Sequence, residues 1–383
     1  MRKFSLTVLL ILIGFSFSNI LRAQISTAVP FLQLAPDSRA GAMGESGTAI
    51  ADNSAAIFWN PAGLAFQTGS EVSITHSNWL PQFHLDIFYD YLTYKQYVDD
   101  IDGTVSASIT FMNFGEFVRT DAAGNQVGTF RSFDGALTLG YATKLSNDWG
   151  IGFNARVIHS RLSTKGTEGE EGSGVATSVS FDLAAMWRPA KLNLPLIGNF
   201  DNRLSIGANL SNVGPDIYYI DKAQADPIPT NLRLGFAFRL FQNEYNSLTY
   251  TLDFSRLLIQ VPSDSTQSRD GWAKSLITSW GNKNMLREVV TTMGFEYWYG
   301  KPDDFMFALR AGYFYEDPDY GNRKFITIGA GLRYDLYGFD FSYLTTSVFK
   351  NGENHPLNDT LRFTVLIGWG SKQQKTLGFP RGI

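Results

Sequence analysis

The chain contains no cysteine and few charged residues. Its 383 residues include Cys 0, which excludes disulfide bonds, thiolate catalysis and zinc sites built on cysteine. Charged side chains make up 18% of the sequence, below the roughly 25% that is typical of soluble domains. Lysine and arginine are not clustered and the formal net charge is -4, so we expect no nucleic-acid partner, because phosphate binding needs concentrated positive charge.

Long apolar runs are also missing beyond the first residues. Arg2 and Lys3 precede an apolar stretch, Phe4–Phe17, and Ala23 then offers a small residue for cleavage. This pattern is typical of a secretory signal peptide, which we assign to residues 1–23. A membrane anchor is the weaker interpretation, because the stretch is short for roughly 30 Å of hydrocarbon. Past this point no segment has the apolar length that a transmembrane helix needs.

Aromatic residues and glycine, in contrast, are abundant, and they occur in an alternating pattern. Aromatic residues make up 14% of the chain and glycine numbers 36. Apolar and polar residues alternate with period two in several segments, which places them on opposite faces of a β-strand. One face of the last such segment holds Leu361, Phe363, Val365, Ile367 and Trp369, and the other holds Arg362, Thr364 and Gly368 together with Leu366. Small polar faces opposite apolar faces that end in aromatic residues are typical of strands between lipid and a lumen.

About fourteen segments of this kind recur, each close to the nine to eleven residues that a tilted strand needs to span a bilayer. They are expected to begin near Glu71, Phe83, Thr104, Phe130, Trp149, Val175, Leu204, Asn231, Leu248, Val289, Phe305, Phe325, Gly338 and Leu361. An even number suits a bacterial barrel with both ends in the periplasm. We therefore predict an all-β fold, a transmembrane antiparallel β-barrel of about 14 strands over residues 71–370, followed by a periplasmic tail at 371–383.

The connections between the expected strands provide an independent test, because bacterial barrels have short periplasmic turns and long external loops. If the first strand runs outward, Asp335–Tyr337 is a short periplasmic turn, whereas Glu116–Gly128 and Ile259–Glu288 are long external loops. Leu80–Gln82 on the outside and Pro189–Arg203 on the inside break the pattern. A soluble β-sandwich or β-propeller also alternates, but its outward faces would be rich in lysine and glutamate.

No motif for catalysis or cofactor binding is present. The histidines, His76, His84, His159 and His355, lack metal-ligand spacing. Residues 99–103 resemble part of a calcium loop without its later ligands, so a solvated turn is the preferred interpretation. There is no nucleophile elbow, phosphate loop or dinucleotide fingerprint. We therefore predict no catalytic residue, no metal and no cofactor, and a protein that is not an enzyme.

The segment ahead of the barrel, residues 24–70, is too apolar for a flexible leader. Its small residues allow tight packing, and Asn60 followed by Pro61 starts a turn. We expect this segment to be a plug inside the lumen. The residues to which we assign structural roles in the plug are Pro30, Phe31, Asp37, Arg39, Gly41, Gly44, Asn60 and Pro61.

A second informative segment is the expected external loop Ile259–Glu288. Trp272, Leu276, Ile277 and Trp280 recur there at helical spacing. An exposed loop with two tryptophans either folds back on its own barrel mouth or meets a partner. Both interpretations stay open, and these four residues are the candidates for contact with a partner or cargo.

The segment before the barrel resembles that of the PorV family, a branch of the FadL-like outer-membrane barrels. The matching residues are Ala28–Leu32, Ala35–Gly41, Met43, Gly44 and Trp59–Ala62, the last of these shared more broadly with FadL-like proteins. The resemblance implies an outer-membrane component of the type IX secretion system in a Gram-negative bacterium of the Bacteroidota type. It implies binding of C-terminal signal domains of exported cargo at the translocon barrel SprA. Delivery to the sortase PorU of the attachment complex, where the signal is removed and lipopolysaccharide is joined, is implied as the next step.

The main alternative is a FadL-like transporter of hydrophobic compounds, in which the plug gates the lumen. Such a transporter should line its lumen with a contiguous apolar path, whereas the inward faces here are glycine, serine, threonine and arginine. A shuttle should present an apolar external surface, which the loop Ile259–Glu288 offers. A third possibility is a structural or adhesive barrel that presents its loops.

Overall fold

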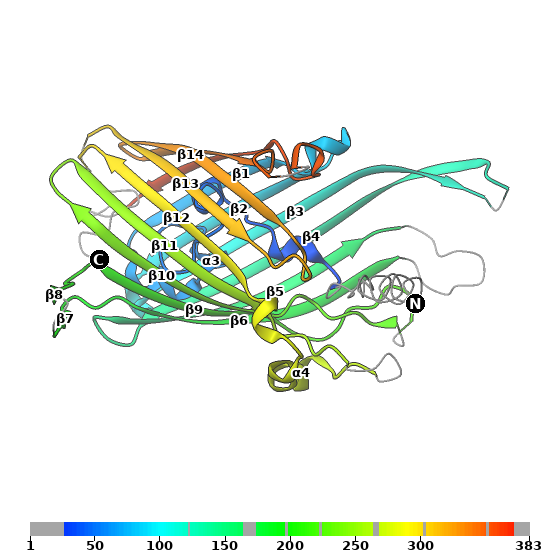
Figure 1. Ribbon diagram of the computed structural model, residues 1–383, viewed down its shortest axis with the longest axis horizontal. Helices are drawn as coiled ribbons and strands as arrows, with labels where there is room; N and C mark the ends of the chain where they lie inside the picture. Colours follow the sequence, from blue (N-terminus) through cyan, green and yellow to red (C-terminus); the bar gives the residue numbers. More distant parts are fainter. Residues whose placement is uncertain are drawn as a thin grey trace, which may run out of the picture.

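A closed barrel of antiparallel strands forms the body of the computed structural model, as Figure 1 shows. The structure describes residues 27–121, 123–163, 174–195, 198–221, 224–262, 268–301, 304–349 and 352–370. The expected signal peptide and the expected periplasmic tail lie outside these described residues.

Each strand of the barrel pairs with its neighbours in the sequence, and β1 closes the barrel against β16. The strands of the barrel are β1 (Ser70–Asn78), β2 (Phe88–Val98), β3 (Gly103–Thr120), β4 (Gln126–Lys144), β5 (Trp149–Arg161), β6 (Val175–Trp187), β9 (Leu204–Val213), β10 (Asn231–Gln242), β11 (Asn246–Leu257), β12 (Val290–Tyr299), β13 (Met306–Tyr315), β14 (Lys324–Tyr334), β15 (Tyr337–Thr345) and β16 (Thr360–Trp369). Two short strands, β7 (Asn193–Leu194) and β8 (Gly198–Asn199), pair with each other in the long connection between β6 and β9. The prediction of a 14-stranded antiparallel barrel is confirmed.

Short helices lie before the first strand and in the connections. They are η1 (Pro30–Gln33), α2 (Ser38–Gly41), α3 (Ala56–Trp59), η2 (Pro61–Phe66), η3 (Pro81–Phe83), η4 (Asp99–Ile101), α4 (Trp272–Thr278), η6 (Ser279–Gly281), η7 (Met285–Glu288) and η8 (Gly352–Asn354). Among the residues that the structure describes, no helix has the length and apolar character needed to span a membrane.

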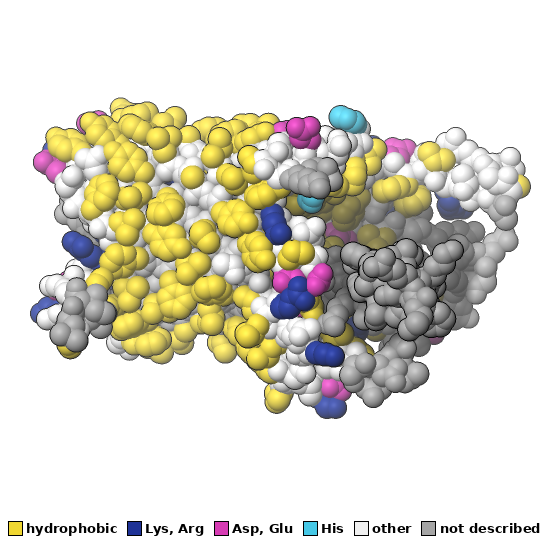
Figure 2. Space-filling view, in the orientation of Figure 1, with side chains coloured by type: hydrophobic (Ala, Val, Ile, Leu, Met, Phe, Trp, Pro, Cys, Tyr) yellow, Lys and Arg dark blue, Asp and Glu magenta, His cyan; other side chains and the backbone are white. Residues whose placement is uncertain are grey.

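The two faces of the wall differ in polarity as the alternation predicts. On β16, Val365 is 46% exposed on the outer face, whereas the inward Arg362 is 1% exposed. β14 repeats the pattern, with Ile328 exposed and Thr327 buried. Figure 2 shows apolar side chains over the barrel wall and charged ones gathered near its two ends. Such a surface suits a wall whose outer solvent is lipid.

Aromatic side chains form a belt at each end of the wall. At the external end, neighbouring rings lie 5.7 to 6.2 Å apart on β1 to β5. This external belt consists of His76, Phe88, Phe111, Phe133 and His159. At the other end, the rings of Trp149 and Trp187 stack at 6.0 Å, and those of Tyr245 and Tyr299 at 6.3 Å. Aromatic belts of this kind occupy the two interfaces between membrane and water.

Two predictions about the wall were wrong. The second strand begins at Phe88 and not near Phe83, because Leu80 and His84 adopt left-handed backbone conformations on either side of the turn η3. The loop expected at Glu116–Gly128 is mostly strand, since β3 and β4 continue as a hairpin. Its turn is closed by Asp121, whose carboxylate accepts hydrogen bonds from the backbone N–H groups of Ala123 and Asn125 at 2.9 and 2.8 Å.

Candidate functional site

Residues 28–67, which we call the lumenal segment, lie inside the barrel and are mostly buried (Figure 1). The segment begins at the external mouth, where the Ala28 N–H donates to the carbonyl of Pro227 in the β9–β10 loop at 3.0 Å. It ends at the opposite mouth, where the chain continues into β1. The segment therefore passes through the lumen from one end to the other.

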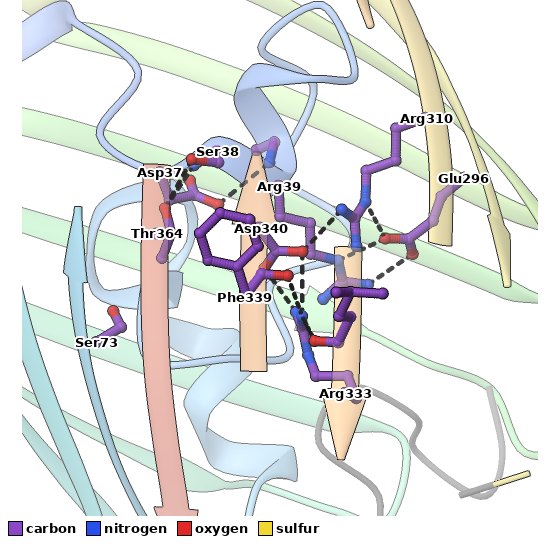
Figure 3. Close-up of polar contacts among 12 residues, drawn as sticks. Asp37, Ser38, Arg39, Ser73, Glu296, Arg310, Arg333, Phe339, Asp340 and Thr364 are labelled. Carbon is purple, nitrogen blue, oxygen red and sulfur yellow. Dashed lines mark hydrogen bonds and ion pairs between the residues drawn. The ribbon is translucent and has the colours of Figure 1, made fainter. Parts of the chain in front are cut away.

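Arg39 is the centre of a buried charge network that joins the lumenal segment to the wall. Its guanidinium donates to both carboxylate oxygens of Glu296 on β12, each at 2.7 Å, and also pairs with Asp52. Arg310 on β13 bridges Glu296 and Asp340, each at 2.8 Å, and Arg333 donates to Asp340 at 2.6 Å. Figure 3 shows Arg39 of the lumenal segment together with Glu296, Arg310, Arg333 and Asp340 of the barrel wall. Three guanidinium groups therefore face three carboxylates within this network, and each charge has a partner.

Asp37 fixes the turn that presents Arg39. Its carboxylate caps α2 by accepting from the Ala40 N–H at 3.1 Å, and it also accepts from the indole N–H of Trp59 at 2.6 Å. The next residue, Ser38, donates its backbone N–H to the Thr364 hydroxyl on β16 at 3.0 Å (Figure 3). A side-chain cap of this kind stabilises a helix start by about 1 kcal/mol.

The two predicted glycines lie close to the barrel wall. A Cβ on Gly41 would lie 3.2 Å from the guanidinium of Arg362. Gly44 has a positive φ of 68°, and a Cβ there would lie 2.5 Å from the backbone oxygen of Tyr313. Only glycine combines this backbone conformation with this approach of two main chains.

Asn60 and Pro61 lie against the opposite side of the lumen. The Asn60 side chain accepts from the Ala62 N–H at 3.1 Å, and its amide donates to the carbonyls of Thr48 and Ala185. Pro61 starts η2, which packs on the inward faces of β4, β5 and β6. Together with the Arg39 network on β12 to β15, this contact fastens the segment to both sides of the barrel.

Pro30 and Phe31 lie at the external mouth. Phe31 is buried in the main apolar cluster, whereas Pro30 is exposed and lines a cavity of about 510 Å³. Four charged residues of the barrel mouth also line this cavity, and they form two ion pairs. The pairs are Arg256 with Glu288, and Arg323 with Glu316, each 2.7 Å apart.

The four predicted contact residues lie outside the lumen, in the β11–β12 loop. The helical spacing is confirmed, because α4 spans Trp272–Thr278 and η6 follows it. Leu276 is half-buried and accepts from the Trp280 indole N–H at 3.1 Å. The outer faces of Trp272, Ile277 and Trp280 are exposed. The loop therefore packs partly on itself and still presents an apolar surface.

Ion pairs hold this loop at its base. Arg256 donates to Glu288 at 2.7 Å and to the carbonyl of Ser279 at 2.6 Å, and its guanidinium lies 5.2 Å from the Trp280 ring. Arg287 donates to Asp317 of the β13–β14 loop at 2.8 Å, and this hydrogen bond lowers the pKa of that carboxyl. Within the ranges that the structure describes, no group of three or more histidine, aspartate or glutamate side chains could hold a metal ion.

The family profile described as Type IX secretion system protein PorV matches residues 17–264, well over half of the chain. The chain belongs to the PorV family. It is an outer-membrane component of the type IX secretion system, and the family is one of secretion barrels rather than enzymes. The resemblance carried by Ala28–Leu32 and the following motifs is therefore confirmed.

Solved structures similar to this PorV-family chain are outer-membrane barrels. The TodX deltaS2S3 mutant monoaromatic hydrocarbon channel has a TM-score of 0.51 at 12% identity, covering 87% of this chain and 97% of that chain. The Ralstonia pickettii toluene transporter TbuX has a TM-score of 0.45 at 11% identity, covering 87% and 98%. A Pseudomonas aeruginosa FadL homologue has a TM-score of 0.47 at 12% identity, covering 90% and 98%. At these identities the likeness concerns the fold alone. No curated protein matches the sequence.

Sequence reasoning missed the wall residues that receive the lumenal segment. Glu296, Arg310, Arg333 and Asp340 form most of the charge network, yet none was singled out. Each is a charged residue at an inward position of an alternating strand. Asp253 on β11 has the same placement: it is buried and accepts from the N–H groups of Gly47 and Thr48 at 3.0 and 2.8 Å.

Removal of the Arg39 side chain should release the lumenal segment. Arg39→Ala leaves buried carboxylates of Asp52 and Glu296 short of a partner, which costs about 3–5 kcal/mol. Amide hydrogen exchange in α2 should accelerate in the purified barrel. Arg131→Ala is the matched control, because Arg131 is exposed and 3.8 Å from Glu116, where an ion pair contributes about 0–1 kcal/mol. Equal exchange in both variants would contradict the role of Arg39.

A methyl group at Gly44 should disturb the contact between segment and wall. Gly44→Ala and Gly124→Ala both place a side chain at positive φ, which costs about 1–2 kcal/mol in each case. Only the first also meets backbone atoms, since nothing lies within 4 Å of a Cβ on Gly124. Urea unfolding in lipid vesicles should therefore show a clearly larger loss for Gly44→Ala. The same loss for both variants would mean that the close approach is unimportant.

Proposed function

We propose that this PorV-family barrel binds the C-terminal signal domain of exported proteins at the cell surface and carries it from SprA to PorU. At the attachment complex the signal is removed and lipopolysaccharide is joined to the cargo. The observation that carries the proposal is the apolar surface of the β11–β12 loop, held on a rigid base outside the lumen. Membership of the PorV family supports a role in type IX secretion. The apolar loop supports the binding of signal domains.

This loop exposes more apolar surface than the loops of soluble proteins usually do. Ile277 is 77% exposed and Leu286 is 78% exposed, and Trp272 and Trp280 of the same loop are exposed as well. Exposed aromatic and aliphatic side chains grouped in this way mark sites of protein contact. The side chains lie beyond the strands, in the β11–β12 loop at the external mouth, so a protein at the cell surface can reach them.

The contacts at the base of the loop favour tight binding, because they already order the loop before a partner binds. The buried pair Arg256–Glu288 fixes the loop to the end of β11. Asn282 donates to the carbonyl of Ile259 at 3.0 Å and so ties the two arms of the loop together. Arg287 ties the loop to its neighbour through Asp317. A preorganised surface loses less conformational entropy when a partner binds.

We infer that the lumenal segment acts as a plug. Its ties to β12–β15 and to β4–β6 lie on opposite sides of the lumen, and its glycines approach the wall to contact distance. A carrier that handles its cargo at the external face has no need to pass it through the lumen. The plug would then keep the outer membrane sealed during delivery.

Transport of hydrophobic compounds is the second candidate, and the cavity of about 510 Å³ at the external mouth favours it. Its lining includes the half-buried Arg323, which would lose hydration to an apolar molecule that offers no hydrogen bond in return. The binding of signal domains therefore agrees better with the chemistry of the external mouth.

Substitution of the exposed loop side chains tests the proposal. In cells that carry Trp272→Ser with Ile277→Ser, the amount of exported protein attached at the surface should fall about tenfold or more, as expected when two central contact residues are lost. The barrel should remain in the outer membrane at its normal level. Surface attachment is measured by protease accessibility of one exported protein.

Val348→Ser is the matched control, because Val348 is also an exposed apolar residue of an external loop, between β15 and β16. This control should export normally. Normal attachment in the double variant, together with reduced uptake of a monoaromatic hydrocarbon, would reject the carrier and favour the transporter.

A further inference from the structure

The β3–β4 hairpin projects past the rest of the barrel at its external end (Figure 1). β2 pairs with β3 only as far as Asn113, and β5 pairs with β4 only as far as Phe133. Beyond these residues the two strands pair only with each other, from Gly115 opposite Ser132 to Thr120 opposite Gln126. We call this part the projecting hairpin. It lies on the external side of the aromatic belt.

The edge of β3 in the projecting hairpin has an open main chain. Within the described residues, Glu116–Thr120 form backbone hydrogen bonds to β4 and to no other element. In an antiparallel pair, alternate residues point their N–H and C=O groups away from the partner strand. Proteins usually protect such an edge with proline, charged side chains such as lysine, or a covering element. This stretch contains neither proline nor lysine, and of its two charged residues Glu116 lies 3.8 Å from Arg131 of β4.

A bulge at the base of the hairpin reverses which face of β3 is apolar. The register shifts between Asn113 and Gly115, so Phe114 is an extra residue, and Gly115 has a positive φ of 90°. A shift of one residue exchanges the two faces of a strand. Phe111 lies on the lipid side, but Phe117 lies on the side of the buried, inward Ser132. The two faces of β3 therefore exchange at the external end of the part of the wall that faces lipid.

The reversed face forms an apolar hollow. Phe117 stacks on Phe130 with ring centroids 5.7 Å apart, and both rings lie on the face that continues the lumen side of the wall. Phe114, Leu162 and Ser132 complete the lining of a hollow of about 310 Å³. Two of its lining residues, Phe114 and Phe117, belong to β3, the strand with the open edge. A main-chain edge next to an apolar pocket is the combination by which proteins recognise an added strand.

We propose that the projecting hairpin receives an extended segment of an exported protein, which adds as a strand along Glu116–Thr120 and places apolar side chains in the hollow. This inference rests on the proposed function. The hydrogen-bonding groups of the open edge identify its partner as a polypeptide. Another extended chain can match successive N–H and C=O groups of a strand edge, whereas a lipid tail cannot. The aromatic rings of Phe117 and Phe130 supply the accompanying side-chain contact.

Amide hydrogen exchange tests the proposal in the full-length barrel. The probe is the purified C-terminal signal domain of one protein exported by the same secretion system. With the domain at about ten times its Kd, exchange of the outward amides in Glu116–Thr120 should slow about tenfold. Phe117→Asp should weaken binding of the domain. Val127→Asp on the same hairpin should not, because Val127 does not line the hollow.

The possible outcomes separate the two proposals. If the domain binds while exchange in Glu116–Thr120 is unchanged, strand addition is rejected and the carrier function stands. If Phe117→Asp and Val127→Asp bind as the unaltered barrel does, the hollow plays no part and the inference is again rejected. If the domain does not bind the unaltered barrel at all, the carrier function falls and strand addition falls with it.

Discussion

The pairing of β1 with β16 closes the wall of the barrel. Eight successive residue pairs, from Ser70 opposite Trp369 to Ser77 opposite Arg362, join the two ends of the wall. In hydrocarbon no water can satisfy an open strand edge, so a sheet can span a membrane only when it closes on itself. Closure then divides the surroundings into lipid outside and an enclosed lumen inside, and it imposes opposite polarity on the two faces of every strand.

The filling of the lumen follows from that division. Inward charges such as Glu296, Arg310 and Asp340 cannot be left without partners in a narrow, poorly hydrated interior. Arg39 of the lumenal segment supplies the third cation of the network, and Asp52 supplies the third carboxylate. The same residues that make the interior polar therefore bind the segment that occupies it. In our proposal, cargo binding belongs to the parts beyond the membrane, namely the β11–β12 loop and the projecting hairpin.

Alternation of polarity was enough to predict the strand number and most strand starts, because a two-faced environment acts on every residue of the wall. It failed where local geometry decides the structure. The turn η3 replaced the expected strand start at Phe83 because left-handed residues flank it. The bulge at Phe114 could not be predicted from the polarity pattern. One inserted residue moves the following side chains to the other face of the strand, but the polarity of those side chains stays the same.

The residues of the candidate site also fall into those that could be predicted from the sequence and those that could not. Asp37, Arg39 and the glycines could be singled out because a local motif contains them. The residues that receive them could not, since Arg39 and Glu296 are 257 positions apart in the chain and no local pattern reports a contact of that range. The exposed tryptophans were predictable as a helical repeat, but only the structure shows that Leu276 packs inward while Ile277 points outward.

Cross-linking between β1 and β16 probes the closure of the barrel, and because the chain has no native cysteine, any disulfide must join the two introduced residues. Ile74 and Val365 are directly opposite each other in β1 and β16. Ile74→Cys with Val365→Cys should form an intrachain disulfide in isolated outer membranes under mild oxidation, since directly opposed cross-strand pairs approach the spacing that a disulfide needs. Ile74→Cys with Ile367→Cys, two residues out of register, should form far less. Equal yields for the two pairs, or none for either in a protein that remains in the membrane, would contradict the closed barrel.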